Sequence, residues 1–132
     1  PINYQTMNSK FTSIVRILLG IILLVFGLNK FYPLPFLPAP QLPESASEFM
    51  NSLVATGYVL PIVGILEIFI ALMLLTKNWI AFALIVLVPI SINILLFHFF
   101  LDLPSIGGAI LVSVLNIILI YKHWPQYRPL FN

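Results

Sequence analysis

The chain has 132 residues, of which 61% are hydrophobic and 8% are charged, with a formal net charge of +2 and a mean hydropathy of +1.08. Because a typical soluble domain has about 25% charged residues, this composition indicates a membrane protein and excludes an ordinary water-facing fold. The small net charge, without a cluster of lysine and arginine, argues against nucleic acid as a partner. The chain contains no cysteine, which excludes disulfides, thiol exchange, cysteine-bound zinc and iron–sulfur clusters on it.

Four long apolar segments predict an all-α, membrane-spanning four-helix bundle, because a helix of about 20 apolar residues crosses a bilayer. We expect the spanning helices at about residues 13–31, 58–76, 79–101 and 105–121, within a single domain of residues 1–132. The N-terminal sequence PINYQTMNSKF lacks the small-residue cleavage pattern of a signal peptide, so we expect the first apolar segment to be retained. Its polar start, residues 1–12, is expected to be a cytoplasmic tail or a brief surface helix.

The first two apolar segments carry small residues at heptad spacing. Gly20 and Gly27 are seven residues apart in the first segment, and Gly57, Gly64 and Ala71 repeat this spacing in the second. Small side chains let two helices approach closely in a membrane. We therefore expect these faces to pack against neighbouring helices.

Between these segments, residues 32–43 contain five prolines, which favours an extended or turning path. Ser45 then precedes Glu48 by three residues, the spacing of a capping box. Phe49 and Leu53 share one side of the helix that would follow. We expect a short amphipathic helix at about residues 44–56, lying on the membrane face as a lid over the bundle or simply as a capping loop.

The charges predict the orientation of the bundle. Five of the six lysine and arginine residues lie on one side if the N-terminus is cytoplasmic: Lys10, Arg16, Lys77, Lys122 and Arg128. Lys30 alone lies on the other side, together with most of the acidic residues. This asymmetry follows the positive-inside rule and predicts a multi-pass membrane protein with both termini in the cytoplasm.

Several polar residues interrupt the apolar segments, and their expected depths place them in the outer half of the bundle. An ionisable side chain within a span costs roughly 2.5–3.5 kcal/mol on insertion scales, so it is expected to face protein and to have a partner. Glu67 and Asn93 lie at matched depth, counted from the expected outer ends. The candidate residues for a ligand pocket are Asn29, Lys30, Glu67, Asn93, His98 and Asn116.

Two interpretations of these residues stay open. In the functional one, Glu67 is a proton acceptor or ligand group, Asn93 and Asn116 orient the ligand, and Lys30 and His98 donate to it. In the structural one, the asparagines and Glu67 brace neighbouring helices by hydrogen bonds and His98 lies at the interface. We expect no metal site, because only Asp102 lies one helical turn from His98.

Parts of the sequence resemble a known family. The segments RILLGIILLVFGLNKF, FMNSLVATGYVLPIVGILEI and VPISINILLFHFFLD, and the tail ending in YRPLF, resemble the DoxX family of small bacterial membrane proteins over roughly residues 14–131. The resemblance implies a four-helix bundle in the bacterial inner membrane and highlights Asn29, Lys30, Glu67, Asn93 and His98. Some relatives in that family are linked to thiosulfate:quinone oxidoreductase or to membrane redox-stress complexes.

These observations favour an accessory subunit of a larger membrane complex, respiratory or redox, with a polar outer-leaflet pocket for a quinone or a lipid. Its partners would be the bilayer and other membrane subunits or further copies of itself, and no covalently bound cofactor is expected. One alternative is a quinone-linked oxidoreductase that acts on a small sulfur anion. A second alternative is a small-molecule transporter, against which the absence of an internal repeat argues.

Overall fold

The structure, a computed structural model, describes residues 9–37 and 41–132, and every regular element in these ranges is helical. The long helices are α1 (Ser9–Asn29), α3 (Val59–Thr76), α4 (Ile80–Leu101) and α5 (Gly107–Lys122). The shorter elements are α2 (Glu44–Ala55), the turn η2 (Leu103–Ser105), α6 (Trp124–Tyr127) and the turn η3 (Arg128–Phe131). The all-α prediction is thus confirmed for the part of the chain that the structure describes.

Three of these helices, α1, α3 and α4, are long and apolar enough to cross a membrane. Helix α5 passes the same test together with the tail of residues 124–131, from which it is bent by 75°. By length and composition, the described residues therefore include three helices that could span a membrane, or four if the bent pair counts as one span. This agrees with the expected number of apolar segments.

The helix bounds differ from the expected ones mainly at the start of α1. This helix begins at Ser9, four residues before the apolar stretch, and the Thr12 hydroxyl donates a hydrogen bond to the Ser9 carbonyl at 3.1 Å. Because a helix can continue through polar residues that face the interface, the onset of hydropathy underestimates its length. The rest of the predicted polar tail, residues 1–8, lies outside the described residues.

The expected capping box of the short helix is wrong. Helix α2 begins at Glu44, so Ser45 lies inside the first turn and makes no capping hydrogen bond. Pro43 occupies the N-cap position, with φ −54°, and its carbonyl accepts the Ser47 N–H at 2.9 Å. The proline sets the backbone at the helix start and leaves the serine hydroxyl without a capping role. In the predicted proline-rich path, residues 38–40 lie outside the described part.

The small-residue faces pack α1 against the antiparallel α3. A Cβ atom on Gly27 would lie 2.8 Å from Cγ1 of Ile68 and 3.1 Å from the carbonyl oxygen of Gly64. A Cβ on Gly20 would lie 3.6 Å from the Ala71 carbonyl oxygen. The heptad prediction holds for these four residues, because only small side chains permit this approach of the two backbones.

The predicted place of Gly57 on this face is wrong. It lies before α3 at φ 78°, and a Cβ atom there would meet nothing within 4 Å. Its N–H donates to the Val54 carbonyl at 3.0 Å, so it turns the chain at the end of α2. The seven-residue spacing therefore continues to Gly57 in the sequence, but the packed face begins at Gly64 because α3 starts at Val59.

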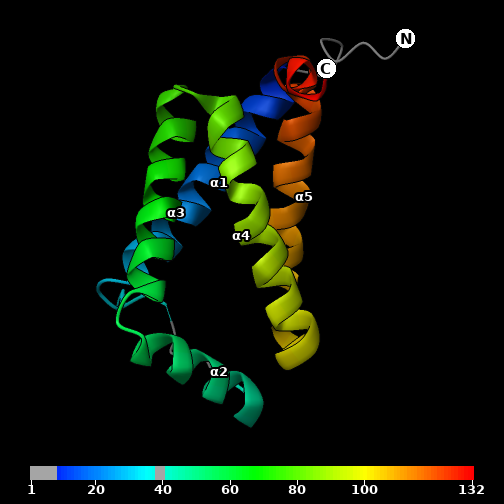
Figure 1. The fold of residues 1–132 in the computed structure, drawn as a ribbon. Coiled ribbons are helices and arrows are strands. Elements are labelled where there is room, and N and C mark those ends of the chain that lie inside the picture. The colour runs from blue at the N-terminus through cyan, green and yellow to red at the C-terminus, as the bar shows by residue number, and fades with distance from the viewer. Residues whose placement is uncertain (1–8, 38–40) are drawn as a thin grey trace.

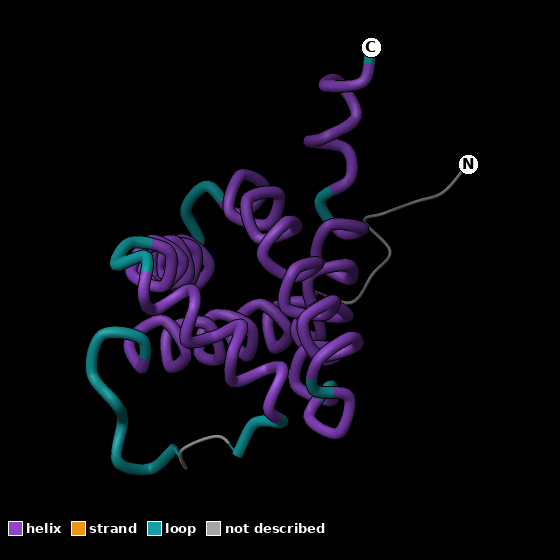
Figure 2. Tube along the Cα trace, turned by 60° about the horizontal axis from the view of Figure 1, so that its bottom comes forward, coloured by secondary structure: helices purple, strands orange, loops and turns teal. Residues whose placement is uncertain are grey.

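The long helices form one bundle whose two ends differ (Figure 1). One end holds the start of α1, the turn between α3 and α4, and the tail of α6 and η3. The other end holds the loops on either side of α2, and α2 itself runs crosswise beneath the ends of α3 and α4. Figure 2 shows the described loops confined to the ends of the helices.

Leucine-rich packing fills the interior, while large apolar side chains also cover the outside. The largest fully buried apolar side chains are Leu19, Leu23, Ile70, Leu74, Leu84, Leu87 and Leu119. Outward-facing residues such as Ile14, Ile65 and Ile117 are 57–65% exposed. An outer surface this rich in apolar side chains suits a hydrocarbon environment and would be a liability in water.

At both ends of the bundle, a short element packs against a long helix that is distant in the sequence. The rings of Phe49 in α2 and Phe97 in α4 lie 5.7 Å apart, and Ala46 of α2 is fully buried. At the opposite end, the Tyr127 hydroxyl donates to the Ala81 carbonyl at 2.6 Å. The amphipathic helix and the C-terminal tail are therefore parts of the fold.

Candidate functional site

The pair of Lys30 and Glu67 joins α1 to α3 in the half of the bundle nearer α2. Lys30 Nζ lies 2.6 Å from Glu67 Oε1, and the two side chains are 24% and 2% exposed. The glycine contact produces this pairing, since the hypothetical Cβ of Gly64 would lie 3.2 Å from Cβ of Lys30. The close backbones thus bring an ammonium from the end of α1 to a carboxylate inside α3.

Lys30 meets the carboxylate as an ion pair. The buried Oε1 atom has no aligned hydrogen-bond donor among the described residues, although the Lys30 ammonium lies within contact distance. An ionised carboxylate needs charge compensation inside a span. The arrangement therefore leaves Glu67 dependent on one cation, which is itself partly open to the surroundings.

Asn116 serves a different helix pair. It is buried in α5, and its Nδ2 donates to the Leu84 carbonyl of α4 at 3.2 Å. Its Oδ1 accepts the Ser91 hydroxyl of α4 at 3.4 Å. Both bonds cross from α5 to α4, so this amide braces the second half of the bundle in the way that the structural interpretation expected.

We expect Asn116→Leu to lower the free energy of unfolding by about 1–2 kcal/mol, because it removes an interhelical amide and leaves the Ser91 hydroxyl without an acceptor. Denaturation in mixed micelles would measure the change. Ser113→Ala is the matched control on the same helix, since the buried Ser113 hydroxyl has no hydrogen-bond partner. A loss as large in Ser113→Ala would contradict the brace.

Three other predicted residues make local contacts. Asn93 is exposed, and its Nδ2 donates to the Pro89 carbonyl of its own helix at 2.7 Å. Asn29 accepts the Leu34 N–H at 2.9 Å, which holds the turn after α1. His98 Nδ1 lies 3.7 Å from a carboxylate oxygen of the buried Asp102, at the end of α4.

The contacts therefore divide the six candidates into separate groups. Lys30 and Glu67 lie together between α1 and α3, Asn116 braces α4 and α5, and His98 lies 3.7 Å from Asp102. Nothing in the sequence pattern linked Asn116 to Ser91. Among the described residues, no side-chain hydrogen bond joins Glu67 to an asparagine. The ligand-binding roles of these residues stay predictions.

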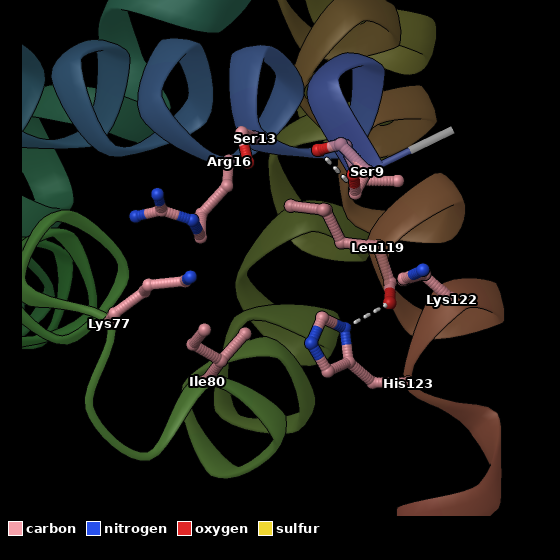
Figure 3. Close-up of a pocket in the computed structure, with 9 residues that line it drawn as sticks. Ser9, Ser13, Arg16, Lys77, Ile80, Leu119, Lys122 and His123 are labelled. Atoms are coloured by element: carbon pink, nitrogen blue, oxygen red, sulfur yellow. Dashed lines mark hydrogen bonds between the residues drawn. The ribbon is translucent and has the colours of Figure 1, made fainter. Parts of the chain in front are cut away.

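A second site lies at the opposite end of the bundle, and the sequence analysis did not identify it. This pocket has a volume of about 160 Å³ and opens between the start of α1, the turn after α3 and the end of α5. Four basic side chains line it: Arg16, Lys77, Lys122 and His123. Figure 3 shows Lys77 projecting toward the middle of the pocket, with Arg16 on the α1 side and the His123 ring across from it.

Local backbone geometry positions two of these cations. Lys77 ends α3 in the left-handed conformation, with φ 62°, and the Asn78 N–H bonds to the Met73 carbonyl. That closure leaves the Leu74 carbonyl without its helical donor, and Nη1 of Arg16 donates to it. The guanidinium is therefore held at the C-terminal end of α3, where a cation is favoured by the helix dipole.

A sequence signal for this pocket did exist. The charge asymmetry that predicts the orientation includes Arg16, Lys77 and Lys122, and the topology brings their helix ends to the same end of the bundle.

Among the described residues, no group of three or more His, Cys, Asp or Glu side chains is placed to hold a metal ion. Comparisons of the chain with protein-family models, curated proteins and solved structures found no match.

Proposed function

We propose that this chain is an accessory subunit of a larger, DoxX-like complex of the bacterial inner membrane, with a ligand site for a quinone or a lipid head at its outer end. The observation that carries the proposal is the 2.6 Å ion pair between Lys30 and Glu67, whose carboxylate is buried inside α3. Ionisable groups inside a membrane are costly and are commonly found where ligands or protons bind.

The distribution of charge supports the orientation. The end of the bundle that includes the start of α1 and the α3–α4 turn carries Lys10, Arg16, Lys77, Lys122 and Arg128. The end covered by α2 carries Glu44, Glu48 and Asp102. Under the positive-inside rule, the first end faces the cytoplasm and the α2 end faces outward.

The chemistry of the outer end suits a carbonyl-bearing ring or a polar lipid head. A quinone carbonyl needs a hydrogen-bond donor, and Lys30 keeps 24% of its side chain exposed while it pairs with Glu67. Aromatic side chains are exposed at this end of the bundle, with Phe31, Tyr32 and Phe100 between 50% and 73% exposed. Such rings offer apolar contact area for a ligand that arrives from the bilayer.

The polar groups at the outer end suit an accessory role better than the role of an independent redox enzyme. The outer end offers an ammonium, a carboxylate and an imidazole, which bind, orient or exchange protons but carry no electrons. Because the chain has no cysteine, thiol or iron–sulfur chemistry would have to come from a partner subunit. The sulfur-anion oxidoreductase and the transporter gain no specific support from the contacts.

Binding of a short-chain quinone to the purified protein in lipid nanodiscs tests the ligand site. We expect Lys30→Met/Glu67→Gln to weaken binding at least tenfold, because it removes the donor and the charge while avoiding an unpaired buried carboxylate. Lys77→Asn is the matched control, since it removes an ammonium at the other end and should change affinity less than twofold. Equal affinities for the wild type and the double variant would overturn the site.

Extraction from native bacterial membranes with a lipid-preserving polymer, followed by mass spectrometry, tests the accessory role. We expect a larger membrane protein to be recovered in a fixed ratio to this chain, together with a quinone or a defined lipid. Recovery of a lone chain without either would contradict the proposal.

A further inference from the structure

We propose that the basic pocket at the cytoplasmic end binds a phosphate-class anion, supplied by the head of an acidic phospholipid. The pocket is separate from the Lys30–Glu67 pair, and its cytoplasmic placement rests on the orientation proposed above. Its argument has three parts: charge, shape and position.

The charge of the pocket is one-sided. Arg16, Lys77, Lys122 and His123 line it from α1, the α3–α4 turn and the end of α5. The chain has four aspartate and glutamate residues in all, Glu44, Glu48, Glu67 and Asp102, and none of them lines the pocket. No salt bridge of the described residues involves Arg16 or Lys77. Their positive charge is therefore not offset by a carboxylate.

The shape and the donors suit one phosphate group. A cavity of about 150 Å³ holds a benzene-sized molecule, so the pocket's 160 Å³ accommodates a phosphate with attached atoms or waters. Ser9, Thr12 and Ser13 line its α1 wall. The Leu119 carbonyl lies 2.9 Å from Nδ1 of His123, which directs the other ring nitrogen away from the helix. Arginine, lysine and hydroxyl groups are the usual partners of phosphate oxygens.

The position favours a lipid as the source of the phosphate. The pocket lies at the end of the spanning helices, where the headgroups of a bilayer are found. Basic pockets between spanning helices on the cytoplasmic side are known to bind acidic lipid heads. The adjoining outward faces of α1 and α5 are apolar, with Ile14 at 57% and Ile117 at 65% exposed, and would contact the acyl chains.

Native mass spectrometry of the delipidated protein in a neutral detergent tests the proposal. The probes are phosphatidylglycerol, cardiolipin, phosphatidylcholine and inorganic phosphate. We expect one acidic lipid to bind at least tenfold more tightly than phosphatidylcholine. Lys77→Asn/Lys122→Gln should lower that affinity at least tenfold, since each basic residue near the headgroup contributes about fivefold. Asparagine is chosen because it tolerates the left-handed backbone of Lys77.

Arg128→Gln is the matched control, because Arg128 is an exposed base at the same end that does not line the pocket. We expect it to change the affinity less than twofold, and Lys77→Arg to retain wild-type affinity. An equal loss in Arg128→Gln and in the double variant would overturn the pocket in favour of general surface attraction, as would unchanged binding in the double variant.

Inorganic phosphate distinguishes the source of the anion. If 10 mM phosphate leaves lipid binding unchanged, the site recognises the lipid. If phosphate binds alone and acidic lipids do not, the phosphate site stands and a soluble phosphate compound is its ligand. Binding of neither probe would overturn the proposal. The outer variant Lys30→Met/Glu67→Gln should leave all these affinities unchanged, so failure of one site is distinguishable from failure of the other.

Discussion

Replacing Lys30 by methionine is expected to lower the free energy of unfolding by about 3–5 kcal/mol, the usual loss when one partner of a buried ion pair is removed. The methionine fills most of the space of the lysine stem, so the loss reports the charge rather than a cavity. The carboxylate of Glu67, 2% exposed, would be left in the bundle without its cation. Denaturation of the purified protein in bicelles measures the change.

The double variant Lys30→Met/Glu67→Gln separates the ion pair from simple packing. We expect it to recover most of the stability lost in Lys30→Met, because it leaves no uncompensated charge. Glu67→Gln alone should be milder than Lys30→Met, since Lys30 is 24% exposed and its ammonium can reach a more polar environment. A double variant that is less stable than Lys30→Met would show that the two side chains do not interact as an ion pair.

Replacing Gly27 by alanine is expected to cost about 1–3 kcal/mol, which is the range for overpacking a tight interior contact. The new methyl group would lie 3.1 Å from the Gly64 carbonyl oxygen and 3.2 Å from Cβ of Glu67. Neither atom can move without shifting the backbone of α3. Gly27→Leu should be worse and should separate α1 from α3. The loss would be measured by the same denaturation in bicelles.

Gly108→Ala provides the control for the change in helix propensity. A Cβ atom at Gly108 in α5 would meet nothing within 4 Å, so alanine there should raise stability by up to about 1 kcal/mol. The stability change in Gly20→Ala should lie between those of Gly27→Ala and Gly108→Ala, because the 2.8 Å contacts of a Cβ at Gly20 are with the flexible side chain of Leu75. Equal effects in Gly27→Ala and Gly108→Ala would contradict close packing of α1 on α3.

Hydropathy and spacing predicted the helices well, because a membrane imposes strong constraints on length and composition. The short helix was expected at about residues 44–56 and lies at Glu44–Ala55. Spacing within each helix predicted that Gly27 and Gly64 lie on packed faces, and the structure shows that these two faces meet each other. What spacing could not give was the true N-cap, since the backbone that Pro43 fixes decided the start of α2.

The sequence predicted the candidate site only in part. Depth along the helix placed Lys30 and Glu67 in the same half of the bundle but matched Glu67 with Asn93, which is exposed and bonds within its own helix. Depth says nothing of rotation about the helix axis. Asn116 lies on the face of α5 that meets α4, so it bonds to Leu84 and Ser91. The basic pocket was missed because its residues come from three separate helix ends, which only the folded bundle brings together.

Both proposed ligand sites depend on the orientation of the bundle in the membrane. Because the chain has no cysteine, a single introduced cysteine can be labelled selectively to measure that orientation. Ser45→Cys places one thiol on exposed α2, and Asn78→Cys places one in the exposed turn between α3 and α4. In intact bacteria, a membrane-impermeant maleimide should label Ser45→Cys and should label Asn78→Cys only after the membrane is opened. Labelling of Asn78→Cys in intact cells, with Ser45→Cys protected, would contradict this orientation and the placement of both sites.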